Sequence, residues 1–368
     1  MVNAFNLQEI DQEQSLNLCR FFAKMGQNIL LLGRRGVGKT HIAMQAALDC
    51  GLKINYVNLS VVERPDLAGY PNLHDAGDVV TFKSPHYLPK LKPGEKADTL
   101  ILFDEVDKAS PDVTAPLLEI LQFKKLNGQP INALSCILTG NLISEGAYSK
   151  VISSALLDRT AKYVLKFNFE KWVDWAKAND IHDLVLSFLM SNPELACGDD
   201  ETTYYATPSP RGWTLTSDAL FKAHEFKMSD IDTVSSIVAG YVGVEASLKF
   251  STWYKFYRKF EPFINSLLEF GECTLEYSDL SPTEKLIFCV TACHLSKNKL
   301  IEGTSKNKFK PIEILCNFFD KQAVDLEIQI LAMRNSFPTE FVTKHKLYSN
   351  KVFFEKFKKI QENVILKK

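Results

Sequence analysis

Eight consecutive residues, Gly33–Thr40 (Gly-Arg-Arg-Gly-Val-Gly-Lys-Thr), have the types and spacing of a phosphate-binding loop. In such a loop glycines let backbone N–H groups converge on a phosphate, the lysine reaches the β and γ oxygens, and the threonine hydroxyl binds Mg²⁺. The following helix points its positive N-terminus at the phosphates. The nucleotide-binding candidates are Gly33, Arg34, Arg35, Gly36, Val37, Gly38, Lys39, Thr40 and His41. The loop alone predicts nucleotide binding.

Two carboxylates supply the second part of this chemistry. Asp104 and Glu105 follow the apolar run Leu100–Phe103, which predicts a buried strand that ends beside the phosphates. We expect Asp104 to hold Mg²⁺ with Thr40, and Glu105 to orient or deprotonate the attacking water. The alternative is a strand followed by a capping box of the next helix. With the loop, the pair predicts hydrolysis of ATP with Mg²⁺ as cofactor.

The elements that would position these residues alternate along the first half of the chain, as in a parallel sheet flanked by helices. We predict strands over 28–32, 54–59, 99–103, 135–139 and 162–167. Helices are predicted over 11–23, 40–50, 113–121 and 153–157. The dipeptide Asn127-Gly128 predicts a tight hairpin. The proline-rich stretch 62–95 predicts irregular structure.

Three further segments resemble a known family, the AAA+ ATPases, and within it the dynein-related, MoxR-like branch found in phages and bacteria. They are Phe103–Lys108 (Phe-Asp-Glu-Val-Asp-Lys), Ala115–Leu121 and Leu138–Asn141 (Leu-Thr-Gly-Asn). The resemblance implies a P-loop AAA+ parallel sheet flanked by helices, then an all-helical lid and a helical C-terminal extension. It also implies that Asn141 is the sensor 1 residue, which contacts the γ-phosphate or the attacking water.

Two arginines receive roles from the same resemblance. Ser154–Arg159 is similar to the segment that ends in the arginine finger, so Arg159 would act on the ATP of a neighbouring subunit. Pro208–Arg211 resembles the lid motif that supplies the sensor 2 arginine, with Arg211 on the γ-phosphate in its own or the adjacent subunit. Alternatively, Arg159 pairs with Asp158 at a helix end and Arg211 caps or pairs near a helix start.

The resemblance also implies an oligomeric state, a kind of substrate and a partner protein. A trans-acting arginine implies a homo-oligomer, a hexameric ring in this family, that remodels a protein client or inserts a metal or cofactor. A von Willebrand A-type protein is the implied partner. The insert near 82–88 and the Asn127-Gly128 hairpin would face the central pore. One rival is a nucleic-acid loader or translocase with the same nucleotide motifs, and another is a scaffold that binds ATP without turnover.

Composition limits the partners. The net charge of −1 gives no overall attraction to nucleic acid or anionic membrane. No apolar run approaches the ~18 residues of a membrane span, and no signal peptide is apparent, so we expect a cytoplasmic protein. The eight cysteines are then expected as reduced thiols, several of them buried. Cys289, Cys293 and His294 indicate one face of a helix rather than a zinc site.

The second half of the chain is predicted to be helical. We expect an αβ nucleotide domain over 1–169, a lid over 170–250 and an extension over 251–368. Four aromatic residues recur at helical spacing with lysine and arginine around them, which favours a core-facing stripe over a nucleic-acid platform. They are Trp253, Phe256, Tyr257 and Phe260. The lysine-rich tail from Lys344 to Lys368 predicts an amphipathic, basic surface helix, with docking of a partner or of nucleic acid as the alternative.

Overall fold

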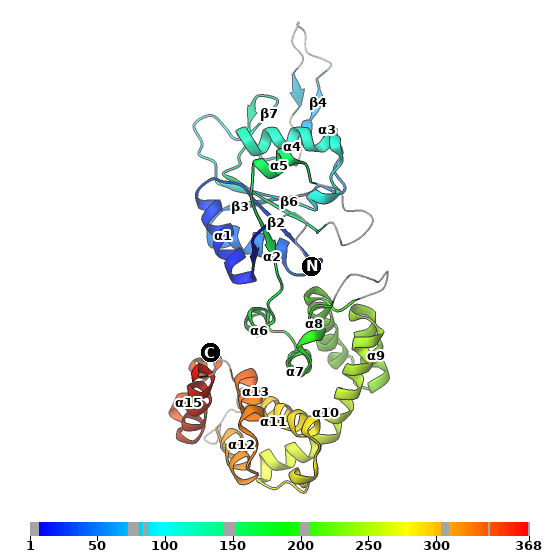
Figure 1. Ribbon diagram of the computed structural model, residues 1–368, viewed down its shortest axis with the longest axis vertical. Coiled ribbons are helices and arrows are strands. Elements are labelled where there is room, and N and C mark those ends of the chain that lie inside the picture. Colours follow the sequence, from blue (N-terminus) through cyan, green and yellow to red (C-terminus); the bar gives the residue numbers. More distant parts are fainter. Residues whose placement is uncertain are drawn as a thin grey trace. The chain divides into compact units, whose positions relative to one another are not determined.

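The computed structural model describes residues 7–72, 81–83, 85, 87–142, 152–198, 207–302, 309–337 and 339–366. The chain divides into two compact units. The first contains residues 1–172 with 199–203 and 209–211, and the second contains the remaining residues from 173 onward. Each unit is described by itself below (Figure 1).

The first unit is built on a parallel sheet of six strands in the order β1-β10-β2-β9-β6-β3. The strands are β1 (Glu9–Ile10), β2 (Ile29–Gly33), β3 (Lys53–Asn58), β6 (Thr99–Asp104), β9 (Ser135–Gly140) and β10 (Ala161–Leu165). Strands β2, β6 and β9 are apolar and buried along nearly their whole length, as expected for central strands covered on both faces. Because all six strands are parallel, their carboxyl ends meet at one edge.

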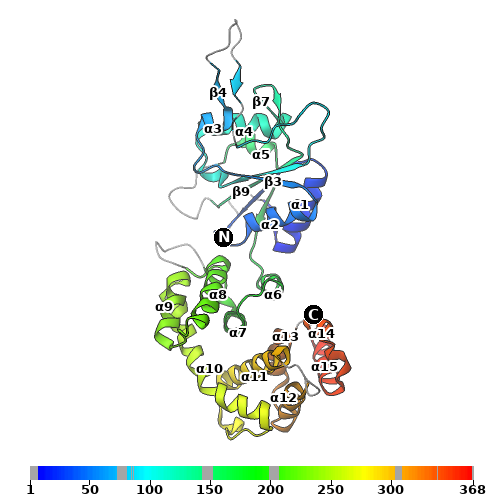
Figure 2. The ribbon, with the colours of Figure 1, turned by 180° about the vertical axis from the view of Figure 1, so that it is seen from behind.

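Helices cover both faces of this sheet (Figures 1 and 2). One face carries α1 (Gln12–Lys24) and α2 (Lys39–Asp49), and the other carries α3 (Arg64–Ala68), α4 (Pro111–Phe123) and α5 (Ser154–Asp158). Two small antiparallel pairs are added, β4 (Tyr70–Pro71) with β5 (Phe82–Lys83), and the hairpin of β7 (Lys125–Leu126) with β8 (Gln129–Pro130).

The described part of the second unit is helical. Its helices are α6 (Phe169–Ala178, which begins in the first unit), α7 (Asp183–Ser191), α8 (Pro210–Glu225), α9 (Ile231–Val242), α10 (Val244–Phe270), α11 (Pro282–Glu302), α12 (Lys310–Lys321), α13 (Leu326–Ser336), α14 (Thr339–Lys344) and α15 (Lys351–Leu366). Phe188 and Phe250 pack against Trp213 in its core. Among the described residues, no helix is both long and apolar enough to cross a membrane.

The predicted fold class is confirmed, a parallel sheet flanked by helices followed by a helical region. The Asn127-Gly128 hairpin is present, with positive φ at both residues. Of the predicted aromatic stripe, Trp253, Tyr257 and Phe260 are buried and Phe256 is half-buried. None of the eight cysteines, which all lie in the described part of the chain, forms a disulfide, and Cys19, Cys136, Cys289, Cys293 and Cys316 are buried. The division of the helical part at residue 250 stays a prediction, and α10 runs through that position without a break.

Candidate nucleotide site

The phosphate-binding loop joins β2 to α2 at the carboxyl edge of the sheet. Gly36 and Gly38 have φ of +72° and +101°, a region that side chains with a Cβ rarely adopt. These two turns carry the chain into α2, which begins at Lys39. The predicted strand, loop and helix are therefore present in the predicted order, with the N-terminus of α2 behind the loop.

Lys39 is nearly buried, with 8% of its surface exposed. Its ammonium donates to the backbone oxygens of Gly33 at 2.6 Å and Arg34 at 2.7 Å, and to Asn141 Oδ1 at 3.2 Å. The charge is thus fixed at the ends of two adjacent strands, β2 and β9. Such a fixed cation beside the loop suits a phosphate oxygen.

Asp104, at the end of β6, accepts hydrogen bonds from neutral groups on several elements. Thr40 Oγ1 and Tyr56 OH donate to its Oδ2 at 3.0 and 3.2 Å. The Glu105 backbone N–H donates to Oδ1 at 3.1 Å, and Thr139 Oγ1 also donates to Oδ1. The four neutral donors fix the orientation of the carboxylate, and no described basic side chain forms an ion pair with it.

The oxygen ligands required by Mg²⁺ are present in this arrangement. Mg²⁺ prefers hydroxyl and carboxylate oxygens and usually keeps several waters. Thr40 Oγ1 and Asp104 Oδ2 lie 3.0 Å apart at the start of α2 and the end of β6. The two residues predicted to hold the metal are therefore adjacent, and their donor set fits the ion.

Asn141 follows β9 and is oriented by a buried carboxylate. Asp107, 1% exposed, accepts the Asn141 backbone N–H at 3.0 Å and its side-chain Nδ2 at 3.3 Å. With Oδ1 on Lys39, the Asn141 amide is held from both sides. Asn141 thus lies beside the lysine of the loop, where the resemblance expects it.

Glu105 has left-handed backbone geometry, with φ of 58° and ψ of 42°. A non-glycine residue in this region is uncommon, and such residues concentrate at functional sites. Its side chain forms an ion pair with Lys108 at 2.9 Å.

Arg159 lies at the opposite edge of the sheet from the phosphate-binding loop. Its backbone oxygen accepts from Asn28 Nδ2, just before β2, whereas the loop follows the end of β2. A five-residue strand separates these ends by about 16 Å. The guanidinium donates to Gln122 Oε1 at 2.8 and 3.0 Å and to the Ala155 oxygen at 2.9 Å, and it is not directed at Asp158. The structure thus does not bring Arg159 together with the other site residues of its own chain.

Arg211 does lie against the phosphate-binding loop. Residues 209–211 belong to the first unit, and the Arg211 backbone N–H donates to the Gly36 oxygen at 3.2 Å. The space above Gly36 is also filled by Ser209, whose Oγ is 3.1 Å from where a Cβ on Gly36 would be. Arg211 is exposed at its side chain and adds positive charge to the site.

Three contributing residues were missed by sequence reasoning. Asp107 and Thr139 lie inside the quoted motifs, so their positions were visible although their contacts were not. Tyr56 gave no signal, because its hydroxyl reaches Asp104 only through the pairing of β3 with β6. Burial raises the pKa of Tyr56, and the nearby Asp104 charge adds to this, so the phenol remains a donor at neutral pH.

The strand order, the loop and the two carboxylates define a P-loop nucleoside triphosphatase. Residues 28–160 match the AAA domain of the dynein-related subfamily. Among curated proteins, the chaperone protein ClpB of Mycoplasma genitalium is 30% identical over 127 residues, 31% of this chain and 17% of ClpB. ClpB of Mycoplasmoides gallisepticum is 33% identical over 101 residues, 26% of this chain and 13% of ClpB. The chain thus spans less than a fifth of the length of these relatives.

Solved structures with a similar chain trace have low sequence identity. The RuvB Holliday junction branch migration motor of Thermotoga maritima is 16% identical, with 73% of this chain and 78% of RuvB covered and a TM-score of 0.37. A putative ATPase from Cytophaga hutchinsonii is 16% identical, with 88% and 81% covered and a TM-score of 0.33. The family match and the site geometry together identify residues 28–160 as an AAA+ P-loop ATPase domain.

Proposed function

We propose that this protein is a MoxR-like AAA+ ATPase that hydrolyses ATP in a hexameric ring and uses the energy to remodel a protein client. The single observation that carries the proposal is that, within one chain, Arg159 lies far from the residues around the phosphate-binding loop. Lys39, Asp104 and Asn141 meet at one edge of the sheet, while Arg159 is held at the other. A site that needs an arginine on the γ-phosphate would take it from a neighbouring copy.

The residues divide the reaction between them. The backbone N–H groups of 34–40 and the Lys39 ammonium would bind the β- and γ-phosphates. Thr40 and Asp104 would hold Mg²⁺, which neutralises phosphate charge when bound. Glu105 would accept a proton from the attacking water, and Asn141 would orient that water or the γ-phosphate. Arg211, whose backbone N–H donates to the Gly36 oxygen, would add a second positive charge.

The similarity to ClpB chaperones covers 31% and 26% of this chain, and it supports work on a protein client over work on nucleic acid. Insertion of a metal or cofactor is a variant of the same client remodelling. A von Willebrand A-type protein is the first partner to test by co-purification with Glu105→Gln protein. If instead single-stranded DNA raised ATP turnover, with a steep loss at higher salt, the loader or translocase alternative would replace the proposal.

Mixing two inactive variants tests the shared site. The Arg159→Ala chain retains Glu105 in its own site, and the Glu105→Gln chain retains Arg159 for the site of its neighbour. A mixed ring therefore contains some sites in which both residues are present. We expect each variant alone to lose turnover, and an equal mixture to recover roughly a quarter of the wild-type rate. The measurement is phosphate release at a protein concentration where rings form, checked by sedimentation velocity.

The matched control mixes Glu105→Gln with Lys39→Ala. Both changes damage the site of their own chain, so no arrangement in a ring restores one, and no recovery is expected. Absence of recovery in the Arg159→Ala mixture, despite rings, would refute the trans role. Wild-type turnover in Glu105→Gln or Lys39→Ala alone would refute the assigned chemistry.

A further inference from the structure

The guanidinium of Arg159 is held by two uncharged oxygens, one of them on α4. Nε and Nη2 donate to Gln122 Oε1 at 3.0 and 2.8 Å, and Nη1 donates to the Ala155 oxygen at 2.9 Å. Because the guanidinium is planar, three bonds to two acceptors fix its orientation as well as its position. The Gln122 side chain thus orients Arg159 within its own chain.

The bonds to Gln122 and Ala155 are compatible with binding of a phosphate by the same guanidinium. Arginine has five N–H groups, and these bonds use one on each of its three nitrogens. Nη1 and Nη2 each carry a second N–H, and a parallel pair of N–H groups is the fork with which arginine binds phosphate. Because a glutamine oxygen is uncharged, it accepts these bonds without compensating the positive charge.

A buried asparagine fixes the backbone of Arg159 against the end of α4. Asn28, 9% exposed, donates from Nδ2 to the Leu121 oxygen at 2.8 Å and to the Arg159 oxygen at 3.2 Å. Lys124 Nζ donates to Asn28 Oδ1 and holds this amide in turn. Because Leu121 directly precedes Gln122, the Asn28 amide keeps the Arg159 backbone next to the helical turn that carries the glutamine.

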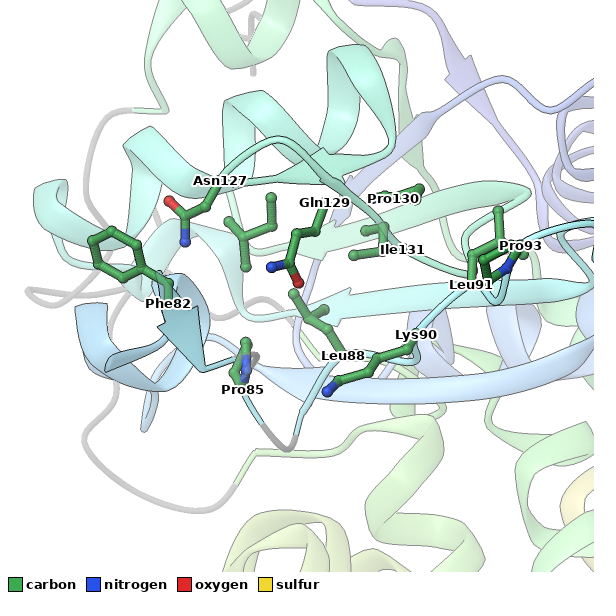
Figure 3. Close-up of a pocket in the computed structure, with 11 residues that line it drawn as sticks. Phe82, Pro85, Leu88, Lys90, Leu91, Pro93, Asn127, Gln129, Pro130 and Ile131 are labelled. Carbon is green, nitrogen blue, oxygen red and sulfur yellow. The ribbon is translucent and has the colours of Figure 1, made fainter. Parts of the chain in front are cut away.

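The last turn of α4 is also attached to the β7–β8 hairpin. The Lys124 oxygen accepts the Ile131 N–H at 3.0 Å, and Ile131 forms an antiparallel bridge with Lys90. Figure 3 shows Ile131 with Leu88 and Lys90 in the pocket between this hairpin and the segment after β5. Gln122 itself is exposed, but the helix end that carries it is attached on two sides. An exposed side chain on such a fixed support can orient Arg159 reproducibly.

We propose that Gln122 is a positioning residue that presents Arg159 to the ATP of the neighbouring subunit. The inference rests on the proposed trans role of Arg159 and adds a second residue to the chain that contributes the arginine. An arginine side chain loses much of its rotational freedom when it binds a phosphate, and holding it in place beforehand lowers that cost. Gln122 acts through Arg159 rather than on ATP directly.

Gln122→Met removes the acceptor and keeps a long, helix-favouring side chain. We expect turnover at saturating ATP to fall to about a tenth of the wild-type rate, because Arg159 is no longer held in place. The KM for ATP should change less than about twofold, because the lost restraint acts in the transition state. The measurement is phosphate release over a range of ATP concentrations, at a protein concentration where sedimentation velocity shows rings.

Gln45→Met is the matched control. Gln45 lies on α2, which covers the other face of the sheet, and its Nε2 donates to Asp49 Oδ1 at 2.8 Å. The same substitution there should keep turnover within about twofold of the wild type.

Mixed rings assign Gln122 to the chain that contributes the arginine. In an equal mixture of Gln122→Met and Glu105→Gln chains, about a quarter of the sites combine an intact Glu105 with an intact Gln122 and Arg159 from the neighbour. We therefore expect about a quarter of the wild-type turnover. In an equal mixture of Gln122→Met and Arg159→Ala chains, no chain contributes a well-held arginine, and we expect about a twentieth. If Gln122 served the site of its own chain, the two values would be exchanged.

Gln122→Glu separates positioning from a structural contribution. A carboxylate keeps the acceptor and binds the guanidinium as a charge-assisted pair, so thermal unfolding should occur at the wild-type temperature or above it. The pair compensates the charge that would stabilise the γ-phosphate, so we expect turnover to fall about threefold to tenfold. A glutamine that only stabilised the end of α4 would leave the turnover of this variant unchanged, and that result would contradict the inference.

Three further results would overturn the inference. They are wild-type turnover of Gln122→Met, an equal loss in Gln45→Met, and exchanged values in the two mixtures. Loss of rings in the Gln122→Met protein would also overturn it, because Gln122 would then act in assembly. Failure of the proposed function is seen separately, as absence of recovery in the mixture of Arg159→Ala and Glu105→Gln chains.

Discussion

Asp104 in the αβ unit and Asp183 in the helical unit are both hydrogen-bonded carboxylates, but the groups around them differ in charge. Asp104 in the αβ unit is surrounded by neutral donors, the hydroxyls of Thr40, Tyr56 and Thr139 and one backbone N–H. Asp183 in the helical unit instead faces two basic side chains. His294 Nδ1 is 3.0 Å from its Oδ2, and Lys297 Nζ is 3.4 Å from its Oδ1.

The charge of the surrounding groups determines whether each carboxylate can bind a cation. Burial alone opposes the ionised form of Asp183, but the hydrogen bonds and charges of His294 and Lys297 hold its pKa below its usual range. The charge of Asp183 is thus compensated inside the protein, which is typical of a structural ion pair. Among the residues that the structure describes, Asp104 is oriented by neutral donors and forms no ion pair, an arrangement that suits a carboxylate ligand of a cation. The donors around a carboxylate, not the carboxylate itself, distinguish a binding site from a structural contact.

The largest expected effect comes from replacing Asp104 by asparagine. Asp104→Asn removes the negative charge that would hold Mg²⁺, so we expect ATP turnover to fall by about 10²–10³-fold. The hydroxyl donors around it can rotate to suit an amide, so the free energy of unfolding should change by about 1 kcal/mol or less. Phosphate release and thermal unfolding followed by circular dichroism measure the two quantities.

Asp183→Asn is the matched comparison in the helical unit. It leaves His294 and Lys297 without their carboxylate, so we expect the helical unit to lose about 3 kcal/mol of stability. Trp175, Trp213 and Trp253 lie in this unit and make tryptophan fluorescence a suitable probe of its unfolding in urea. A stable Asp183→Asn protein, or a strongly destabilised Asp104→Asn protein, would remove the distinction between the two carboxylates.

The neighbour of Asp183 predicts a dependence of stability on pH. His182 Nδ1 accepts the N–H of Leu184 at the start of α7, and burial lowers the pKa of His182 to about 4, with smaller effects of Asp183, His294 and His224. Between the ordinary histidine pKa of about 6.5 and this value, the unfolded chain binds a proton that the folded chain does not. Stability of the helical unit should therefore fall by about 2–3 kcal/mol as pH drops through this range, measured by urea unfolding with tryptophan fluorescence.

His182→Asn separates this effect from other titrations. Asparagine is a good N-cap and does not titrate, so it should keep the cap and flatten the dependence on pH. His224→Asn, an exposed position on α8, should leave the dependence as in the wild type. If the free energy of unfolding changed equally with pH in the wild type and both variants, His182 would not be the group that controls the pH dependence.

Local sequence signals were sufficient for the sheet and the loop. An apolar run before a glycine-rich loop predicts β2 and the start of α2 because the backbone needs of that turn are met within a few residues. The motif order likewise predicted that Lys39, Asp104 and Asn141 lie together, because parallel strands end at one edge. The two-residue strand β1 has too few residues to give a pattern.

The remaining features depend on contacts between distant segments. The order of the motifs predicted a role for Arg159, but it did not predict at which edge of the sheet Arg159 lies. That position depends on the contact between Asn28 Nδ2 and the backbone oxygen of Arg159. The pairing of Asp183 with His294 joins α7 to α11 across more than a hundred residues of chain. Neither segment carries a motif, so the sequence predicted helices there but not which faces would meet.

The smallest effect concerns the donor that gave no sequence signal. Tyr56→Phe removes one of four hydrogen bonds to Asp104 and keeps the ring, which is 44% exposed on the edge strand β3. We expect the Mg²⁺ concentration for half-maximal turnover to rise about threefold, because a less restrained carboxylate binds the ion less well. Turnover at saturating Mg²⁺ should stay within about twofold of the wild type. Tyr163→Phe, on β10 with its ring near Phe22, controls for loss of a phenol elsewhere in the same unit. If Tyr56→Phe and the wild type had the same Mg²⁺ dependence, the three remaining donors would be enough to orient Asp104, and Tyr56 would only pack on the edge of the sheet.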